Sequence, residues 1–149
     1  MLLKTERFPA VRIYWDRVKG YAPLFFYTLL LFKGALMAPG EIPGFISRIN
    51  DKFLHAVEYF FLFLFSVHAF SRSQTLRIRE HCQGAAMAYA LILGIMTEAA
   101  QFFFTAGRTA EIGDFFLDGV GAFAALFFLR AAMEIRLRIP MRQEAGTVI

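Results

Sequence analysis

The chain has almost no cysteine, since Cys82 is the only one among its 149 residues. A single cysteine cannot form an internal disulfide, and it excludes both a CxxC redox motif and a metal site built from cysteines. The sequence also lacks the HExxH, GxSxG and P-loop patterns of known enzyme classes. It therefore predicts no cofactor and no resident metal ion, and it leaves Cys82 as a passive thiol.

Charge is also scarce, because charged residues make up 19% of the chain while hydrophobic residues make up 58%. That balance is too apolar for an ordinary soluble domain of this length. The formal net charge is +4, yet Lys and Arg stand in short runs beside apolar blocks and do not form one basic stretch. This arrangement suits anionic lipid headgroups, so membrane lipids are expected partners and nucleic acid is not.

Four apolar blocks hold most of the hydrophobic residues, and each is about as long as the roughly 20 residues that cross a hydrocarbon core. Lipid offers backbone groups no hydrogen-bond partner, so each block is expected to be a helix. The sequence therefore predicts an all-α, polytopic membrane bundle of four transmembrane helices. The expected spans are residues 21–37, 53–70, 84–104 and 112–130.

The segment before the first span is basic and also carries apolar residues. Val11, Tyr14 and Val18 recur there at helical spacing. The segment is therefore either an interfacial helix on the inner membrane surface or a simple tail that sets orientation. The expected divisions of the chain are a basic segment at 1–20, a transmembrane domain at 21–133 and a tail at 134–149.

Basic residues flank the four spans unevenly. They precede the first span, lie between the second and third, and follow the fourth, whereas the other two loops are nearly charge-balanced. Because positively charged loops stay in the cytoplasm, both termini are expected on the cytoplasmic side of the plasma membrane. The residues that set this orientation are Lys4, Arg7, Arg12, Arg17, Lys19, Arg72, Arg77, Arg79, Arg130, Arg136, Arg138 and Arg142.

Polar side chains within the spans gather toward the opposite, extracytoplasmic side. An ionisable group in a span costs several kcal/mol unless it faces water, a partner or the bundle interior, so each is a candidate for function. Glu98 is expected roughly 9 Å and Asp118 roughly 6 Å from the outer ends of their helices, at similar depth. The expected ligand-binding residues are Asp51, Lys52, His55, Glu98, Gln101, Arg108, Asp114 and Asp118.

Spacing places several of these side chains on shared helix faces. Asp51 and His55 are four residues apart, as are Asp114 and Asp118. Glu98 follows an apolar run, so its carboxyl group must be protonated or paired. Asp51 and Asp114 also stand where helix N-caps are expected, so capping and binding both remain open for these two residues.

Four motifs occur in order between residues 51 and 118. Their residues are Asp51-Lys52-Phe53-Leu54-His55, Glu98-Ala99-Ala100-Gln101, Gly107-Arg108 and Asp114-Phe115-Phe116-Leu117-Asp118. Across residues 50–125 they resemble the VanZ-like family of small bacterial membrane proteins, whose pattern is DK-x-x-H, E-x-x-Q, a pair containing Arg, and D-x-x-x-N. Asp118 departs from that pattern, since the family usually has Asn there. The added acidic group needs a proton, Arg108 or another cation.

The resemblance implies a protein of the bacterial cell envelope, and the family's founding member is associated with resistance to the glycopeptide teicoplanin. Our first hypothesis is a non-enzymatic protein that binds an anionic headgroup or a lipid-linked cell-wall intermediate. Lys52 and Arg108 would meet its phosphate. One alternative is an intramembrane enzyme that uses His55, Glu98 and Asp114 as acid, base or metal ligands. Another is a small proton-coupled transporter in which Glu98 titrates. The sequence predicts no oligomeric state.

Overall fold

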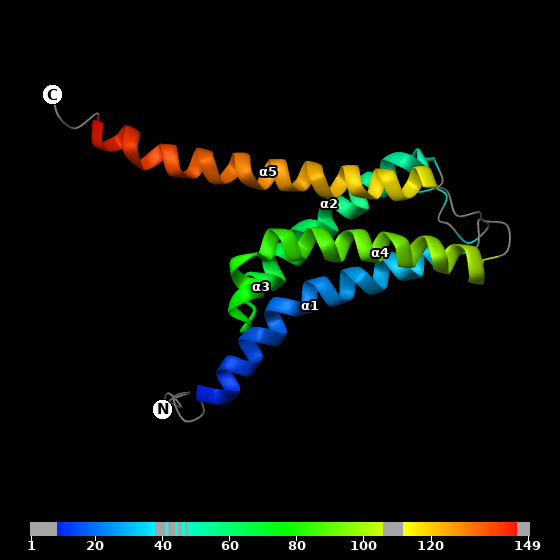
Figure 1. The fold of residues 1–149 in the computed structure, drawn as a ribbon, viewed down its shortest axis with the longest axis horizontal. Coiled ribbons are helices and arrows are strands. Elements are labelled where there is room, and N and C mark those ends of the chain that lie inside the picture. The colour runs from blue at the N-terminus through cyan, green and yellow to red at the C-terminus, as the bar shows by residue number, and fades with distance from the viewer. Residues whose placement is uncertain are drawn as a thin grey trace.

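The computed structural model of the chain consists of helices, and the part of the chain that it describes contains no strand. It describes the backbone of residues 9–37, 41, 44, 46, 48–105 and 112–145, and the side chains of all these residues except 9–17 and 137–145. Four long helices and one short helix follow one another in this part (Figure 1). They are α1 (Pro9–Leu36), α2 (Asp51–Phe70), α3 (Leu76–Glu80), α4 (Cys82–Phe104) and α5 (Ile112–Ala145).

Among the described residues, three helices are long and apolar enough to cross a membrane: α2, α4 and the Ile112–Arg136 part of α5. Their outward faces carry large exposed hydrophobic side chains, such as Phe61, Ile95 and Phe127. A soluble protein rarely exposes so much apolar surface, whereas lipid contact requires it. The prediction of an all-helical fold is therefore confirmed, with three helices able to cross a membrane, whereas the predicted bundle of four spans is not shown.

Two helices are longer than the sequence predicted. α1 runs without a break from Pro9 through the expected start of the first span, and α5 continues past Arg130 to Ala145. Pro23 lies inside α1, where its missing N–H weakens the helical ladder. Figure 1 shows α1 bending near the middle of its length, and the part before the bend diverges from the other helices.

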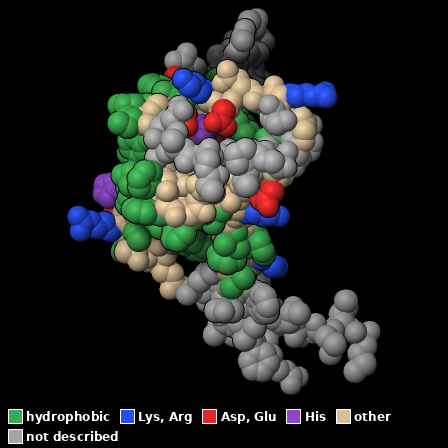
Figure 2. Space-filling view, turned by 90° about the vertical axis from the view of Figure 1, so that its right-hand side faces the viewer, with side chains coloured by type: hydrophobic (Ala, Val, Ile, Leu, Met, Phe, Trp, Pro, Cys, Tyr) green, Lys and Arg blue, Asp and Glu red, His purple; other side chains and the backbone are tan. Residues whose placement is uncertain are grey.

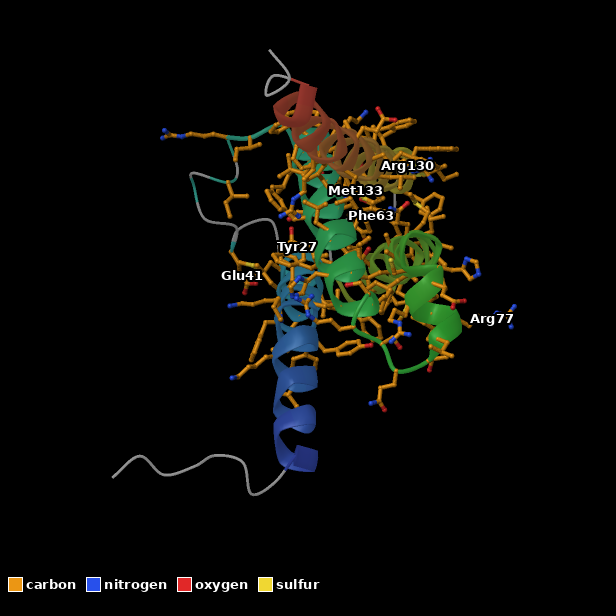
Figure 3. The ribbon with its side chains drawn as sticks, turned by 90° about the vertical axis from the view of Figure 1, so that its left-hand side faces the viewer. Tyr27, Glu41, Phe63, Arg77, Arg130 and Met133 are labelled. Carbon is orange, nitrogen blue, oxygen red and sulfur yellow. The ribbon has the colours of Figure 1, made fainter. Side chains whose placement is uncertain are left out.

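α2 and α4 form the centre of the bundle. Each of them packs against α1 and α5, and they also pack against each other. Two hydrogen bonds attach α1 to this centre: the Tyr27 hydroxyl donates to the Glu58 carbonyl oxygen at 3.0 Å, and the Thr28 and Tyr89 hydroxyls lie 2.8 Å apart. Figure 3 shows Phe63 among the helices and Arg77 extending away from them. The buried core includes Leu24, Leu31, Tyr59, Leu62, Phe63, Leu93, Ala122 and Ala125.

The long helices alternate in direction. α1 and α4 end, and α2 and α5 begin, at the same end of the molecule, on the right in Figure 1. The opposite end holds α3 and the starts of α1 and α4. Side chains near the starts of α2 and α5 and near the end of α4 are thereby brought to one end.

Gly121 allows α5 to approach the backbone of α2 very closely. A Cβ atom added at this position would lie 2.1 Å from the Ala56 carbonyl oxygen and 2.8 Å from its carbonyl carbon. Backbone atoms cannot rotate away as a flexible side chain can, so any larger residue would push the two helices apart. The neighbouring Ala122 and Ala125 are fully buried, as expected for small residues at a close helix contact.

Gly121→Ala is therefore expected to lower the free energy of unfolding by about 1–3 kcal/mol, the usual cost of overpacking. Thermal unfolding of the purified protein in detergent measures the change. Gly119→Ala is the matched control, because a Cβ atom there would meet only Leu91 Cδ2 at 3.9 Å. The control is expected to keep wild-type stability or to gain slightly from the helix preference of Ala. Equal stability of the two variants would contradict the close contact.

Candidate functional site

A hydrogen bond between His55 and Asp118 joins α2 to α5 at the end where both helices begin. Nδ1 of His55 lies 2.9 Å from Oδ1 of Asp118. Asp118 has no exposed surface, and the His55 side chain is 12% exposed. The second ring nitrogen, Nε2, lies 3.9 Å from Oδ2 of Asp114, one turn earlier on α5. The imidazole ring therefore stands between two carboxyl groups of the same helix.

Two overlapping sets of side chains surround His55. In the inner set, His55, Glu98 and Asp118 each offer a potential ligand atom within 4.8 Å of the others. In the outer set, the same holds for Asp51, His55 and Asp114. The inner set takes one residue from each of α2, α4 and α5, and it is buried. The outer set includes the exposed Asp51, so the cluster has a buried side and an open side.

Figure 2 looks onto the end of the molecule that lies on the right in Figure 1. Red atoms of acidic side chains lie beside purple histidine atoms on this face, and blue atoms of Lys and Arg lie near them. Green hydrophobic side chains cover much of the surrounding surface. The polar cluster is thus a local feature on an otherwise apolar body.

The depth of the cluster follows from helix geometry. Glu98 lies six residues before the end of α4 at Phe104, and Asp118 lies six residues after the start of α5 at Ile112. At the usual rise per residue, each is about 9 Å from the end of its helix. The prediction that these two residues meet at similar depth is therefore supported by their shared set with His55.

A hydrogen-bonded pair that the sequence did not single out lies beside the cluster. The hydroxyl groups of Tyr59 and Thr97 are 2.9 Å apart. Thr97 also bonds to the carbonyl oxygens of Leu93 and Gly94, so its hydrogen points to the backbone and Tyr59 donates to it. Tyr59 stands one turn after His55 and Thr97 directly precedes Glu98. Their positions next to His55 and Glu98 in the sequence could have been used to predict this pair.

The helix starts correct one interpretation of the acidic residues. Asn50, and not Asp51, caps α2, because its side chain accepts a hydrogen bond from the Lys52 N–H at 3.0 Å. Asp114 lies in the first turn of α5 and is buried beside His55. Capping of α2 therefore does not explain Asp51, and the geometry associates both aspartates with the imidazole.

Two predicted site residues, Lys52 and Gln101, are not members of these two sets. Lys52 is exposed in the first turn of α2, and Gln101 is buried one turn after Glu98 on α4. Arg108 lies outside the described residues. The acidic residues and His55 are thus brought together, while the two predicted cations are not placed with them by any described contact.

His55→Ala is expected to lower the free energy of unfolding by about 3–5 kcal/mol, because it removes the hydrogen-bond partner of a fully buried aspartate. His55→Ala combined with Asp118→Asn should be more stable than His55→Ala alone, since the amide carries no charge. Thermal unfolding in detergent measures both. His68→Ala is the control, because His68 is exposed near the other end of α2. If His55→Ala lowers the free energy of unfolding no more than His68→Ala does, the stabilising hydrogen bond between His55 and Asp118 is contradicted.

Comparisons of the chain with protein-family models, with curated proteins and with solved structures gave no match. The resemblance to the VanZ-like family therefore stays a prediction that rests on the four motifs. What the residues themselves establish is an all-helical protein with three helices able to cross a membrane and a cluster of His55 and carboxyl groups at one end.

Proposed function

We propose that the chain is a VanZ-like integral membrane protein that binds an anionic headgroup, or a lipid-linked envelope intermediate, at the His55 cluster. The observation that carries this proposal is the convergence of His55, Glu98 and Asp118 from three helices. At about 6–9 Å inside the ends of apolar helices, such side chains lie near the depth at which headgroups meet hydrocarbon tails. Carboxylates and an imidazole at this depth can hold the hydroxyl groups of a sugar or glycerol.

An anionic ligand also needs positive charge near this acidic cluster. Lys52 is exposed beside Asp51, in the first turn of α2. The N-terminal ends of α2 and α5 lie at the same end of the molecule and carry partial positive charge. Arg108, in the segment before α5, is the second cation that we propose for phosphate recognition.

We further propose that α1 is a fourth span. Its Leu24 and Leu31 are buried against the bundle, while Phe25, Phe26 and Leu30 are exposed on its other side. This two-sided pattern suits a helix that packs on protein with one face and meets lipid with the other. The alternating directions of α1, α2, α4 and α5 are compatible with four crossings and with both termini on one side.

From the distribution of basic residues we propose that this side is cytoplasmic, and Cys82 at the start of α4 tests the orientation. Cys82 is partly exposed, so a thiol reagent can reach it. An impermeant maleimide is expected to label the protein in inside-out vesicles and not in intact spheroplasts. The control is Cys82→Ser, which should show no labelling in either preparation. Labelling in intact spheroplasts would show that the orientation is opposite to the one proposed.

Arg108→Ala is expected to reduce the amount of anionic lipid that co-purifies with the full chain from bacterial membranes, as measured by mass spectrometry. Arg108→Lys should give a smaller reduction, because it keeps the charge but loses the planar group that binds phosphate with two hydrogen bonds. Arg77→Ala is the control, since Arg77 is an exposed cation on α3 at the opposite end.

Unchanged lipid in well-expressed Arg108→Ala protein would remove Arg108 from the binding site. If the amount of co-purifying lipid is also unchanged in Glu98→Gln protein, the His55 cluster is not part of the binding site and the proposal is wrong. The VanZ-like resemblance adds one cellular measurement: protection of a sensitive bacterium against teicoplanin by the wild-type chain should fall with the same substitutions.

One observation favours the enzymatic alternative as a second candidate. Asp118 accepts a hydrogen bond from Nδ1 of His55 in the tautomer that leaves Nε2 able to accept a proton, and Nε2 faces Asp114 on the more open side. A carboxylate that fixes an imidazole in this way is a common arrangement for a general base. Turnover of an envelope lipid that is lost in His55→Gln protein would favour this candidate over simple binding.

A further inference from the structure

The geometry points to a divalent transition-metal ion bound by His55, Glu98 and Asp118, a ligand set that differs from the one in the enzymatic alternative by Asp118 in place of Asp114. One nitrogen or oxygen atom from each of these three residues lies within 4.8 Å of the other two. Bonds from Zn²⁺ to histidine nitrogen and carboxylate oxygen are about 2.0–2.2 Å long, so two ligands of one ion lie roughly 3 to 4.4 Å apart. The three side chains therefore need only small adjustments to reach one ion.

A second observation at the same place concerns Asp118. It has no exposed surface, and within the described part of the chain its Oδ2 atom has no hydrogen-bond partner, although Oδ1 bonds to His55. Burying a carboxylate oxygen without a partner is costly, so such an atom indicates a missing cation or proton. A metal ion in the inner set supplies the positive charge that this oxygen lacks.

Gly94 lies directly beside that oxygen. A Cβ atom added at Gly94 would lie 3.0 Å from Asp118 Oδ2 and 3.3 Å from a ring carbon of Phe115. Any larger residue at position 94 would therefore crowd the carboxyl group. Glycine avoids this crowding on α4, the helix that also carries Glu98.

The outer set provides a route to the site and further ligands. Asp51 is exposed, Asp114 is buried, and both lie within 4.8 Å of a nitrogen of His55. They form a path of carboxyl groups from the surface to the inner set.

The ligand types narrow the choice of ion. One imidazole nitrogen with several carboxylate oxygens and no thiolate suits Zn²⁺ or Mn²⁺, whereas an all-oxygen site would suit Ca²⁺ or Mg²⁺. The site does not depend on the proposed lipid ligand. A bound ion would, however, offer a positive charge to a phosphate group at the acidic cluster.

The test measures metal on the purified full chain in detergent, after removal of bound ions with a chelator and dialysis against Zn²⁺ or Mn²⁺. We expect one ion per chain by mass spectrometry, a calorimetric binding signal, and a higher unfolding temperature with the ion. Asp118→Asn and Glu98→Gln should each weaken the affinity about 10-fold or more, since each replaces a carboxylate with an amide of equal size. Both amides preserve the packing of the side chain, so the test can still be made with one variant if the other does not fold.

His68→Gln and Glu80→Gln are the matched controls, because they alter an exposed histidine and an exposed acid at the other end of the molecule. Both should bind the ion as wild type does. Wild-type protein that takes up no stoichiometric ion would overturn the site, as would wild-type affinity in Asp118→Asn and Glu98→Gln. If the protein binds the metal but no lipid co-purifies with it, the metal site is supported and the proposed function is wrong. If lipid co-purifies but no metal binds, the proposed function is supported and the metal site is wrong.

Discussion

The hydrogen bond between His55 and Asp118 connects α2 and α5 at a place where neither side chain is well exposed to water. A carboxylate in that position is stable only if its partner stays in place, and the partner stays only if the helices keep their separation. Gly121 fixes this separation by letting α5 contact the α2 backbone at Ala56, the residue after His55. The polar cluster and the close backbone contact at Gly121 are thus one structural unit, so chemistry at His55 depends on packing at Gly121.

The apolar runs were enough to predict α2, α4 and the first part of α5, because a run of about 20 apolar residues has few other stable conformations. They could not predict where the long helices end. Pro23 and Pro140 are usual signs of an interruption, yet α1 and α5 continue through them, since a helix with neighbours or lipid around it tolerates a lost hydrogen bond. The short α3 has too few residues to show a period.

The cost of placing a charge in an apolar span was sufficient to single out His55, Glu98 and Asp118 from the sequence alone. Which atoms meet could not be predicted, because the rotation of each helix about its own axis is set by contacts far apart in the sequence. The pairing of Tyr59 with Thr97 shows the same limit. Both residues are ordinary in an apolar helix, and only the contact between α2 and α4 brings their hydroxyl groups together.

α5 is much longer than its contact with the rest of the bundle requires. Its buried residues end at Ala125, and every side chain described from Arg130 to Arg136 is exposed. The helix axis from Gly121 to Ala145 is about 36 Å long at the usual rise per residue. A tilt of about 10° around the contact at Gly121 would therefore displace the far end by about 6 Å. α5 is in this sense a lever whose fulcrum lies next to His55, so a change of less than an ångström in the cluster corresponds to a movement of several ångströms at the opposite end of the molecule.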